Sequence, residues 1–94
     1  MGSRWCVLGG GMLGMTLALR LRQAGRDVTL IEAAPDLGGL AGAWEIGGVT
    51  WDKHYHVTLL SDARVRAVLT ELDLDRHMVW NQTLTGFYTG AKHY

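Results

Sequence analysis

The most informative part of this chain is the glycine-rich segment Val7-Leu8-Gly9-Gly10-Gly11-Met12-Leu13-Gly14. It places a G-x-G-x-x-G turn directly after a short apolar segment, and a helical pattern follows the turn. A second apolar segment then ends at Glu32. A lone G-x-G-x-x-G turn is a weak signal, but the order strand, glycine turn, helix, strand and acidic residue is typical of a dinucleotide-binding βαβ unit. The sequence therefore predicts that this segment binds an adenine dinucleotide.

Each glycine of the motif has its own expected task. Gly9 permits the tight turn out of the first strand, and Gly11, which has no Cβ, lets a diphosphate approach the main chain. Gly14 lets the new helix lie close against the strand. The free N–H groups at the start of this helix point at the phosphates, with the positive end of the helix dipole behind them. The alternative interpretation is a glycine turn that only packs a helix tightly and binds nothing.

Periodicity sets the limits of the βαβ unit. Apolar residues spaced three and four apart predict a helix from about residue 11 to residue 23, and Gly25 stands where a helix-ending glycine is expected. Residues 27–31 predict the second strand. Glu32 at its end can accept hydrogen bonds from ribose hydroxyls, while its carboxylate repels a 2′-phosphate. We therefore expect NADP to be disfavoured.

Composition excludes several classes of protein. The 94 residues suffice for one small domain, and a hydrophobic content of 48% with 19% charged residues is ordinary for a globular chain. The formal net charge is +0 and no basic stripe is present, which argues against nucleic-acid binding. The single cysteine excludes an internal disulfide, and we expect Cys6 to be buried and inert in the first strand. No apolar run is long enough to cross a membrane, so we expect a cytoplasmic protein.

The pattern changes after the second strand. A second glycine cluster occupies residues 37–43. Residues 44–46 and 49–51 then predict a hairpin, because they flank a Gly-Gly turn. Further on, Ser61 is a plausible N-cap for a helix through about Leu72. The remainder alternates aromatic and polar residues and predicts short strands, with turns at Gly86 and Gly90.

These features together resemble the FAD-binding amine oxidase superfamily, which includes protoporphyrinogen oxidases, phytoene desaturases and UDP-galactopyranose mutases. In that family the second glycine pair lies beside the flavin end of FAD. Residues 48–52 with His56 look like the hairpin that leads toward the flavin, and residues 84–88 resemble the start of a substrate-side segment. The residues that carry the resemblance are Gly9 to Gly14, Ala18, Gly25, Val28, Glu32, Gly38 and Gly39.

The resemblance implies an α/β fold, namely a truncated Rossmann-type βαβ FAD- or NAD(P)-binding domain with a β-hairpin and a helix after the second strand. Family members are several times longer, so we expect an N-terminal piece of a larger flavoprotein whose C-terminal part is missing. Within residues 1–94 we expect a dinucleotide-binding core over 1–60 and the start of a substrate-side insertion over 61–94. The family often has an arginine two positions before the glycine pair. Here Asp36 stands there, and a carboxylate cannot make the same phosphate contact, which leaves open whether Asp36 weakens FAD binding.

Two further groups of side chains have both a structural and a functional interpretation. His54 and His56 would share one face of a strand, but no third ligand has suitable spacing, so we predict no metal site. The position of His56 in the family implies a place near the flavin, while an exposed or hydrogen-bonded histidine is the simpler interpretation. Trp44, Trp51 and Trp80 could line a substrate cavity, although we expect them in the core.

The sequence thus predicts the FAD-binding portion of a flavin-dependent oxidoreductase, similar to amine oxidases and protoporphyrinogen oxidases, whose parent protein also binds a small-molecule substrate. A piece of a UDP-galactopyranose mutase-like flavoenzyme and a nonenzymatic dinucleotide-binding module are the alternatives. No catalytic residue can be named, and we expect no turnover by this chain alone. The expected cofactor contacts are Gly9, Gly11, Met12, Leu13, Gly14, Glu32, Ala33, Gly39, Leu40 and Ala41.

Overall fold

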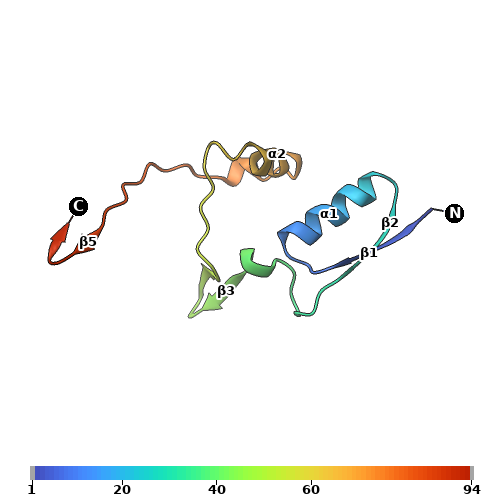
Figure 1. The fold of residues 1–94 in the computed structure, drawn as a ribbon, viewed down its shortest axis with the longest axis horizontal. Helices are drawn as coiled ribbons and strands as arrows, with labels where there is room; N and C mark the ends of the chain where they lie inside the picture. Colours follow the sequence, from blue (N-terminus) through green and yellow to red (C-terminus); the bar gives the residue numbers. More distant parts are fainter. Residues whose placement is uncertain (1, 94) are drawn as a thin grey trace. The chain divides into compact units, whose positions relative to one another are not determined.

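Two parallel strands joined by a helix open the chain, drawn in blue to cyan in Figure 1. In this computed structural model, which describes residues 2–93, β1 spans Arg4–Leu8, α1 spans Met12–Gln23 and β2 spans Asp27–Ile31. The two strands pair in parallel along their whole length. The βαβ unit predicted from the glycine turn is therefore confirmed, and the helix and second strand have the expected limits to within a residue.

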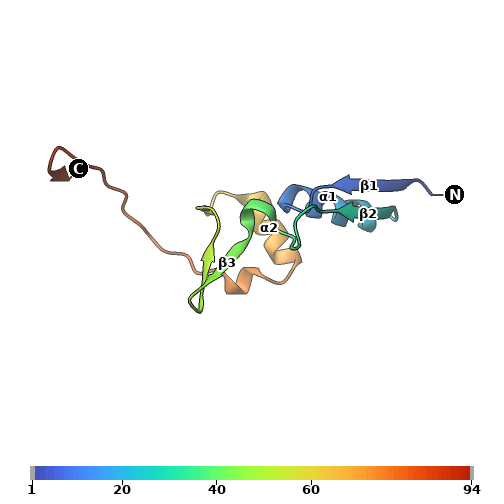
Figure 2. The same ribbon diagram turned by 90° about the horizontal axis from the view of Figure 1, so that it is seen from below.

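The helix α1 lies against one face of the strand pair (Figures 1 and 2). Because side chains alternate along a strand, Val7, Val28 and Leu30 point to the helix side, where Val7 is only 6% exposed and the other two are half-buried. The opposite face carries Cys6 and Ile31, which are exposed. The expectation of a buried Cys6 is therefore wrong, because α1 covers only one face of the pair.

A Schellman motif built on Gly25 ends α1. The N–H of Gly25 donates to the carbonyl of Arg22 at 2.9 Å, and the N–H of Arg26 donates to the carbonyl of Leu21 at 2.9 Å. The φ angle of Gly25 is +73°, a left-handed conformation that glycine adopts without steric cost. The helix-ending role predicted for Gly25 is confirmed, and the chain turns here directly into β2.

The segment after β2 leads through a 3₁₀ turn, η1 (Gly39–Ala41), into an antiparallel hairpin of β3 (Ala43–Ile46) and β4 (Val49–Asp52). Gly47 and Gly48 form its turn with φ angles of +58° and +81°, which is typical of a type I′ turn. Such a turn matches the right-handed twist of the strands that it joins. The predicted hairpin is confirmed.

The chain divides into two compact units between Val57 and Thr58. Neither of the two α-helices in the described part of the chain has the length and apolar character needed to cross a membrane. The elements of the second unit are α2 (Ala63–Glu71), the 3₁₀ turn η2 (Asp75–His77), β5 (Tyr88–Thr89) and β6 (Lys92–His93).

Two expectations for the second unit need correction. The predicted helix is present, but its N-cap is Asp62 rather than Ser61, because the first helical hydrogen bond runs from the Arg66 N–H to the Asp62 carbonyl at 3.0 Å. Between residues 58 and 93, short strands form only at β5 and β6, around the expected turn at Gly90. Residues 81–87, which include Gly86, have no regular structure, since no partner strand pairs with them among the described residues.

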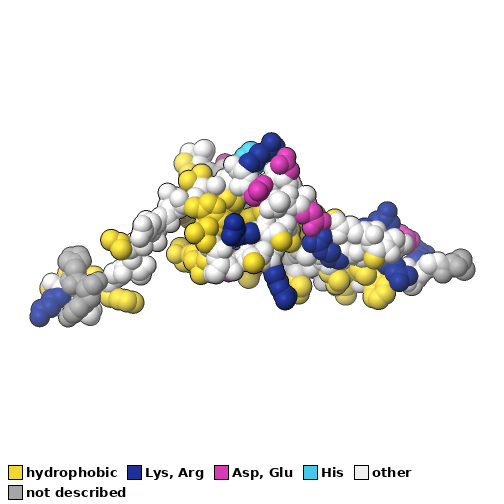
Figure 3. Space-filling model, turned by 90° about the horizontal axis from the view of Figure 1, so that it is seen from above, with side chains coloured by type: hydrophobic (Ala, Val, Ile, Leu, Met, Phe, Trp, Pro, Cys, Tyr) yellow, Lys and Arg dark blue, Asp and Glu magenta, His cyan; other side chains and the backbone are white. Residues whose placement is uncertain are grey.

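Very little of the chain is buried. Val7 is the one buried hydrophobic residue among residues 2–92, and Figure 3 shows hydrophobic side chains gathered on the visible surface. The three tryptophans expected in the core are exposed, at 49% for Trp44, 67% for Trp51 and 40% for Trp80. That expectation is wrong, because a two-stranded hairpin or a single helix by itself encloses no interior.

This shallow burial predicts low stability for the chain by itself. A chain of this size buries only about 60–65% of the surface that it exposes when unfolded. We expect a broad thermal transition below about 65 °C in the absence of ligand, measured by circular dichroism. A sharp two-state melt well above ~65 °C would contradict this expectation.

Candidate functional site

The first glycine turn joins the end of β1 to the start of α1 through main-chain atoms. Gly9, with a φ angle of +103°, donates its N–H to the carbonyl of Ile31 at 2.8 Å, which also ties the turn to the end of β2. A Cβ added to Gly14 would lie 1.8 Å from the carbonyl oxygen of Gly9. No side chain fits at position 14, so the close helix packing predicted for this glycine is present.

Gly11 differs because it presents an open face. It is the N-cap residue of α1, and a Cβ added to it would meet only the Cα of Gly39, at 4.0 Å. The first N–H groups of an α-helix have no partner within the helix, so those of residues 12–14 are donors for an anion. This side of the turn therefore has both the space and the donors that a diphosphate needs.

Glu32 reaches back from the end of β2 onto the glycine turn. One of its carboxylate oxygens accepts the N–H of Gly10 at 2.5 Å, and the other accepts the N–H of Ala34 at 2.9 Å. Main-chain hydrogen bonds from Ala34, Gly10 and Ala33 lower the pKa of Glu32 from its ordinary 4.5, against the smaller opposing effect of desolvation. An ionised carboxylate has about four acceptor positions, so this one can still accept hydroxyl groups of a ligand.

The second glycine segment packs onto the first. The N–H of Gly38 donates to the carbonyl of Gly10 at 2.8 Å, and Gly38 forms an isolated parallel bridge with Gly11. A Cβ added to Gly39 would lie 3.1 Å from the Cα of Gly11. The φ angles of Gly38 and Gly39, +120° and +56°, also favour glycine. The two glycine segments thus form one continuous surface of main-chain atoms.

All of the predicted contact residues lie in the first unit, on or next to this surface. Ala33 directly follows Glu32, and its main chain contributes to the lowered pKa of that carboxyl group. Leu40 and Ala41 follow Gly39 within η1, and their side chains are exposed. The structure brings together the two glycine segments, the start of α1 and the acidic residue in the arrangement that the motif predicts. The cofactor contacts predicted from the sequence are Gly9, Gly11, Met12, Leu13, Gly14, Glu32, Ala33, Gly39, Leu40 and Ala41.

Sequence reasoning missed two residues of this region. Gly10 is buried, its N–H binds Glu32, and a Cβ there would lie 2.4 Å from the side chain of Leu37. The run of three glycines was the available signal for Gly10. Lys53 follows β4, and its N–H donates to the carbonyl of Gly42 at 3.0 Å, which ties the hairpin to the second glycine segment. No local pattern marks Lys53, because only the hairpin register brings it to Gly42.

His54 and His56 take part in no metal centre within the described part of the chain. The strand β4 ends at Asp52, so the alternation that would put both imidazoles on one face does not continue to them. Both side chains are exposed. Among residues 2–93, no group of three or more His, Cys, Asp or Glu side chains is placed to hold a metal ion.

Comparison with known proteins agrees with this geometry. Residues 7–72 match the family model described as NAD(P)-binding Rossmann-like domain. Coproporphyrinogen III oxidase of Mycobacterium tuberculosis is 42% identical over 78 residues, which cover 79% of this chain and 17% of that protein. Protoporphyrinogen oxidase 2 of Arabidopsis thaliana is 30% identical over 78% of this chain and 14% of its own length. Carotenoid 3,4-desaturase of Haloarcula japonica is 44% identical over 49% of this chain and 9% of its own length.

The lowered pKa of Glu32 predicts a pH-dependent stability. A carboxyl group whose pKa is lower in the folded state stabilises the fold above its ordinary pKa, 4.5 here, and loses that contribution as the pH falls through the folded-state pKa. We expect Glu32→Gln to lower the free energy of unfolding at about pH 7, and the difference from the unsubstituted chain to shrink as the medium is acidified below 4.5. Urea unfolding at a series of pH values measures both effects.

Asp36→Asn is the matched control, because it removes a carboxylate from the exposed loop before the second glycine segment. The free energy of unfolding of this variant should lie within about 0.5 kcal/mol of that of the unsubstituted chain at neutral pH. If Glu32→Gln changed the free energy of unfolding equally little at neutral pH, the conclusion that the Glu32 carboxylate holds the glycine turn would be wrong.

Proposed function

We propose that this chain, which belongs to the NAD(P)-binding Rossmann-like domain family, binds FAD as the dinucleotide-binding part of a flavin-dependent oxidoreductase. Its relatives include porphyrinogen oxidases and a carotenoid desaturase, and the chain is a member of the amine oxidase superfamily that its sequence resembles. The observation that carries the proposal is the packing of the Gly38–Gly39 segment on the first glycine turn.

This packing favours FAD over NAD. A mononucleotide-binding half of a Rossmann fold continues from its second strand into another helix and a third strand. Here β2 leads to a second glycine segment, η1 and a hairpin instead. A main-chain surface that extends beyond the phosphate-binding turn suits a cofactor that extends beyond its diphosphate toward a flavin ring.

The residues of the site have separate tasks in the proposed complex. The N–H groups at the start of α1 bind the diphosphate, and the helix dipole stabilises its negative charge. The absence of a side chain at Gly11 keeps the main chain within reach of the phosphate oxygens. Glu32 accepts hydroxyl groups of the adenosine ribose while Gly10 and Ala34 hold it in place. Bound flavin supplies the electron chemistry, and the protein supplies binding and orientation.

The parent protein is the second part of the proposal. The chain spans about 17% of the length of the coproporphyrinogen III oxidase that it matches. We propose that residues 1–60 are the dinucleotide-binding core and that residues 61–94 begin a substrate-side segment, so that the chain alone has no turnover. The names of the relatives favour removal of hydrogen from a porphyrinogen or from a polyene as the reaction of the whole protein.

The identity of the cofactor is tested by titrating the purified chain with FAD, NAD and NADP and measuring the heat of binding by calorimetry. We expect saturable FAD binding with one site per chain. NAD should bind more weakly, and NADP most weakly because the Glu32 carboxylate repels its 2′-phosphate. Saturable NAD binding with none for FAD would overturn the flavin assignment.

Gly11→Val tests the phosphate-binding face. The added side chain enters the space assigned to the diphosphate. Apart from the adjoining residues, the nearest atom to its Cβ is the Cα of Gly39 at 4.0 Å, so the chain should fold while FAD affinity drops by at least about tenfold. Unchanged affinity would count against the phosphate-loop assignment.

Two further substitutions bracket that result. Gly2→Val, where a Cβ meets nothing within 4 Å, should leave both folding and FAD affinity unchanged. Gly14→Ala should instead destabilise the fold, by about 1–3 kcal/mol, because its Cβ meets the carbonyl oxygen of Gly9. Thermal melts of all three variants separate loss of binding from loss of folding.

A further inference from the structure

Binding a diphosphate raises a problem of charge in the first unit. The diphosphate is an anion, and the ionised Glu32 carboxylate lies beside the same glycine turn. The N–H groups at a helix start contribute only about half of one positive charge. A side-chain cation close to the two glycine segments would therefore strengthen the binding of the diphosphate considerably.

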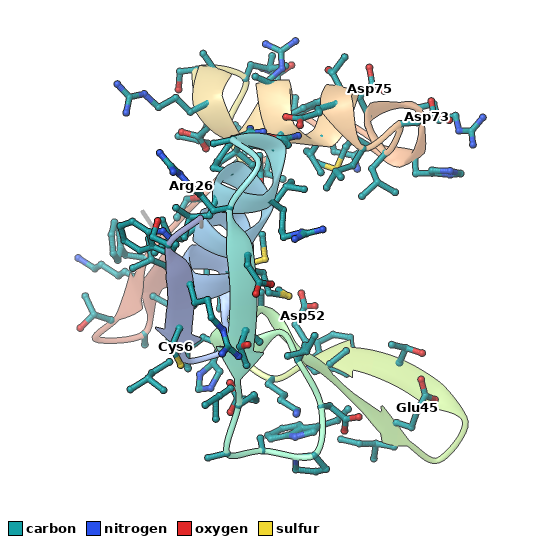
Figure 4. The ribbon with its side chains drawn as sticks, turned by 90° about the vertical axis from the view of Figure 1, so that its right-hand side faces the viewer. Cys6, Arg26, Glu45, Asp52, Asp73 and Asp75 are labelled. Atoms are coloured by element: carbon teal, nitrogen blue, oxygen red, sulfur yellow. The ribbon has the colours of Figure 1, made fainter. Side chains whose placement is uncertain are left out.

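The arginines of the first unit lie away from the glycine segments. Arg20 and Arg22 stand in the last turn of α1, more than about 10 Å along the helix axis from its start. Arg4 and Arg26 lie at the other ends of the strands, as the label on Arg26 in Figure 4 shows. Arg4 also forms an ion pair with Asp27 at 3.7 Å. None of these four guanidinium groups is placed to meet a diphosphate at the glycine turn.

Besides these four arginines, Lys53 is the remaining Lys or Arg residue within residues 2–57, and it lies next to the second glycine segment. Its N–H donates to the carbonyl of Gly42 at 3.0 Å. A Cβ added to Gly42 would lie 3.5 Å from the Nζ of Lys53 and 3.6 Å from its Cδ, so the lysine side chain runs alongside the main chain there. Gly42 directly follows η1, which begins at Gly39, the residue that packs on Gly11.

Lys53 also borders a space that is open to solvent. Lys53 is half-buried and lines an open concavity of about 510 Å³ with Trp44, Trp51 and Tyr55. Asp52, labelled in Figure 4, also lines this concavity. Within the described part of the chain, no ion pair joins the Lys53 ammonium to a carboxylate.

We propose that Lys53 is the side-chain cation that binds the dinucleotide diphosphate, an inference that rests on the proposed function and adds a residue to its site. The main-chain donors of the glycine turns fix the orientation of the phosphates. Lys53 adds a full positive charge on a flexible stem that can reach the anion from the hairpin side. The hairpin then has a function beyond structure, because its register brings this charge to the second glycine segment.

Chemical protection tests the contact directly, because Lys53 and Lys92 are the two lysines of the sequence. The chain is acetylated with an N-hydroxysuccinimide ester in the presence and absence of FAD or ADP-ribose, and each lysine is followed by mass spectrometry. We expect either ligand to slow acetylation of Lys53 several-fold and to leave Lys92 unaffected. Equal acetylation of Lys53 with and without a bound ligand would overturn the contact.

Affinity measurements on variants provide the second test. We expect Lys53→Gln to lower the affinity for FAD and for ADP-ribose by about tenfold each, since ADP-ribose carries the diphosphate without the flavin. Lys53→Arg should restore most of the affinity, and Lys92→Gln should leave it unchanged. Circular dichroism shows whether each variant folds, and if Lys53→Gln does not fold, the protection assay on the unsubstituted chain decides.

The outcomes separate this inference from the proposed function. If the unsubstituted chain binds FAD and Lys53→Gln binds it equally well, the inference fails and the flavin proposal stands. If the chain binds ADP-ribose but not FAD, the flavin proposal fails, and the response of Lys53 to ADP-ribose still decides the inference. If the chain binds neither ligand, both are overturned.

Discussion

The close packing of α1 on the end of β1 requires glycine at position 14. Because a Cβ there would lie 1.8 Å from the carbonyl oxygen of Gly9, only glycine lets α1 begin so close to the end of β1. That closeness sets the unpaired N–H groups of the helix start directly beyond the strand. It also sets Gly11 where the second glycine segment can pack on it. A larger residue at position 14 would push the helix away from the turn and would thereby disrupt the binding surface.

The ionised carboxylate of Glu32 is the main charged group beside this surface. The Glu32 carboxylate uses part of its hydrogen-bonding capacity to hold the main chain of Gly10 and Ala34, and this bonding keeps it ionised. The same charge favours hydroxyl groups and opposes further phosphates nearby. A diphosphate beside such an acid needs compensating positive charge, which the helix start supplies in part and which the proposed role of Lys53 would complete.

Local chemistry explains which elements the sequence could predict. The helix limits, the Gly25 ending of α1 and the type I′ turn at Gly47-Gly48 each depend on residues within one or two turns of chain. Burial was predicted poorly, as Cys6 and the three tryptophans show. A hydrophobic pattern indicates that a face can be covered, but it does not indicate what covers it. In this chain α1 covers one face of the strand pair and leaves the other exposed.

The βαβ unit, its glycine turn and the acid at the end of β2 can all be predicted from the amino-acid sequence, because each follows from backbone sterics and periodicity along a short stretch. Three contacts become visible once the chain is folded. The Gly38–Gly39 segment packs on the first turn, Gly10 binds Glu32, and Lys53 lies against Gly42. These contacts join residues distant in sequence, and they depend on strand register and loop path, which no local pattern encodes.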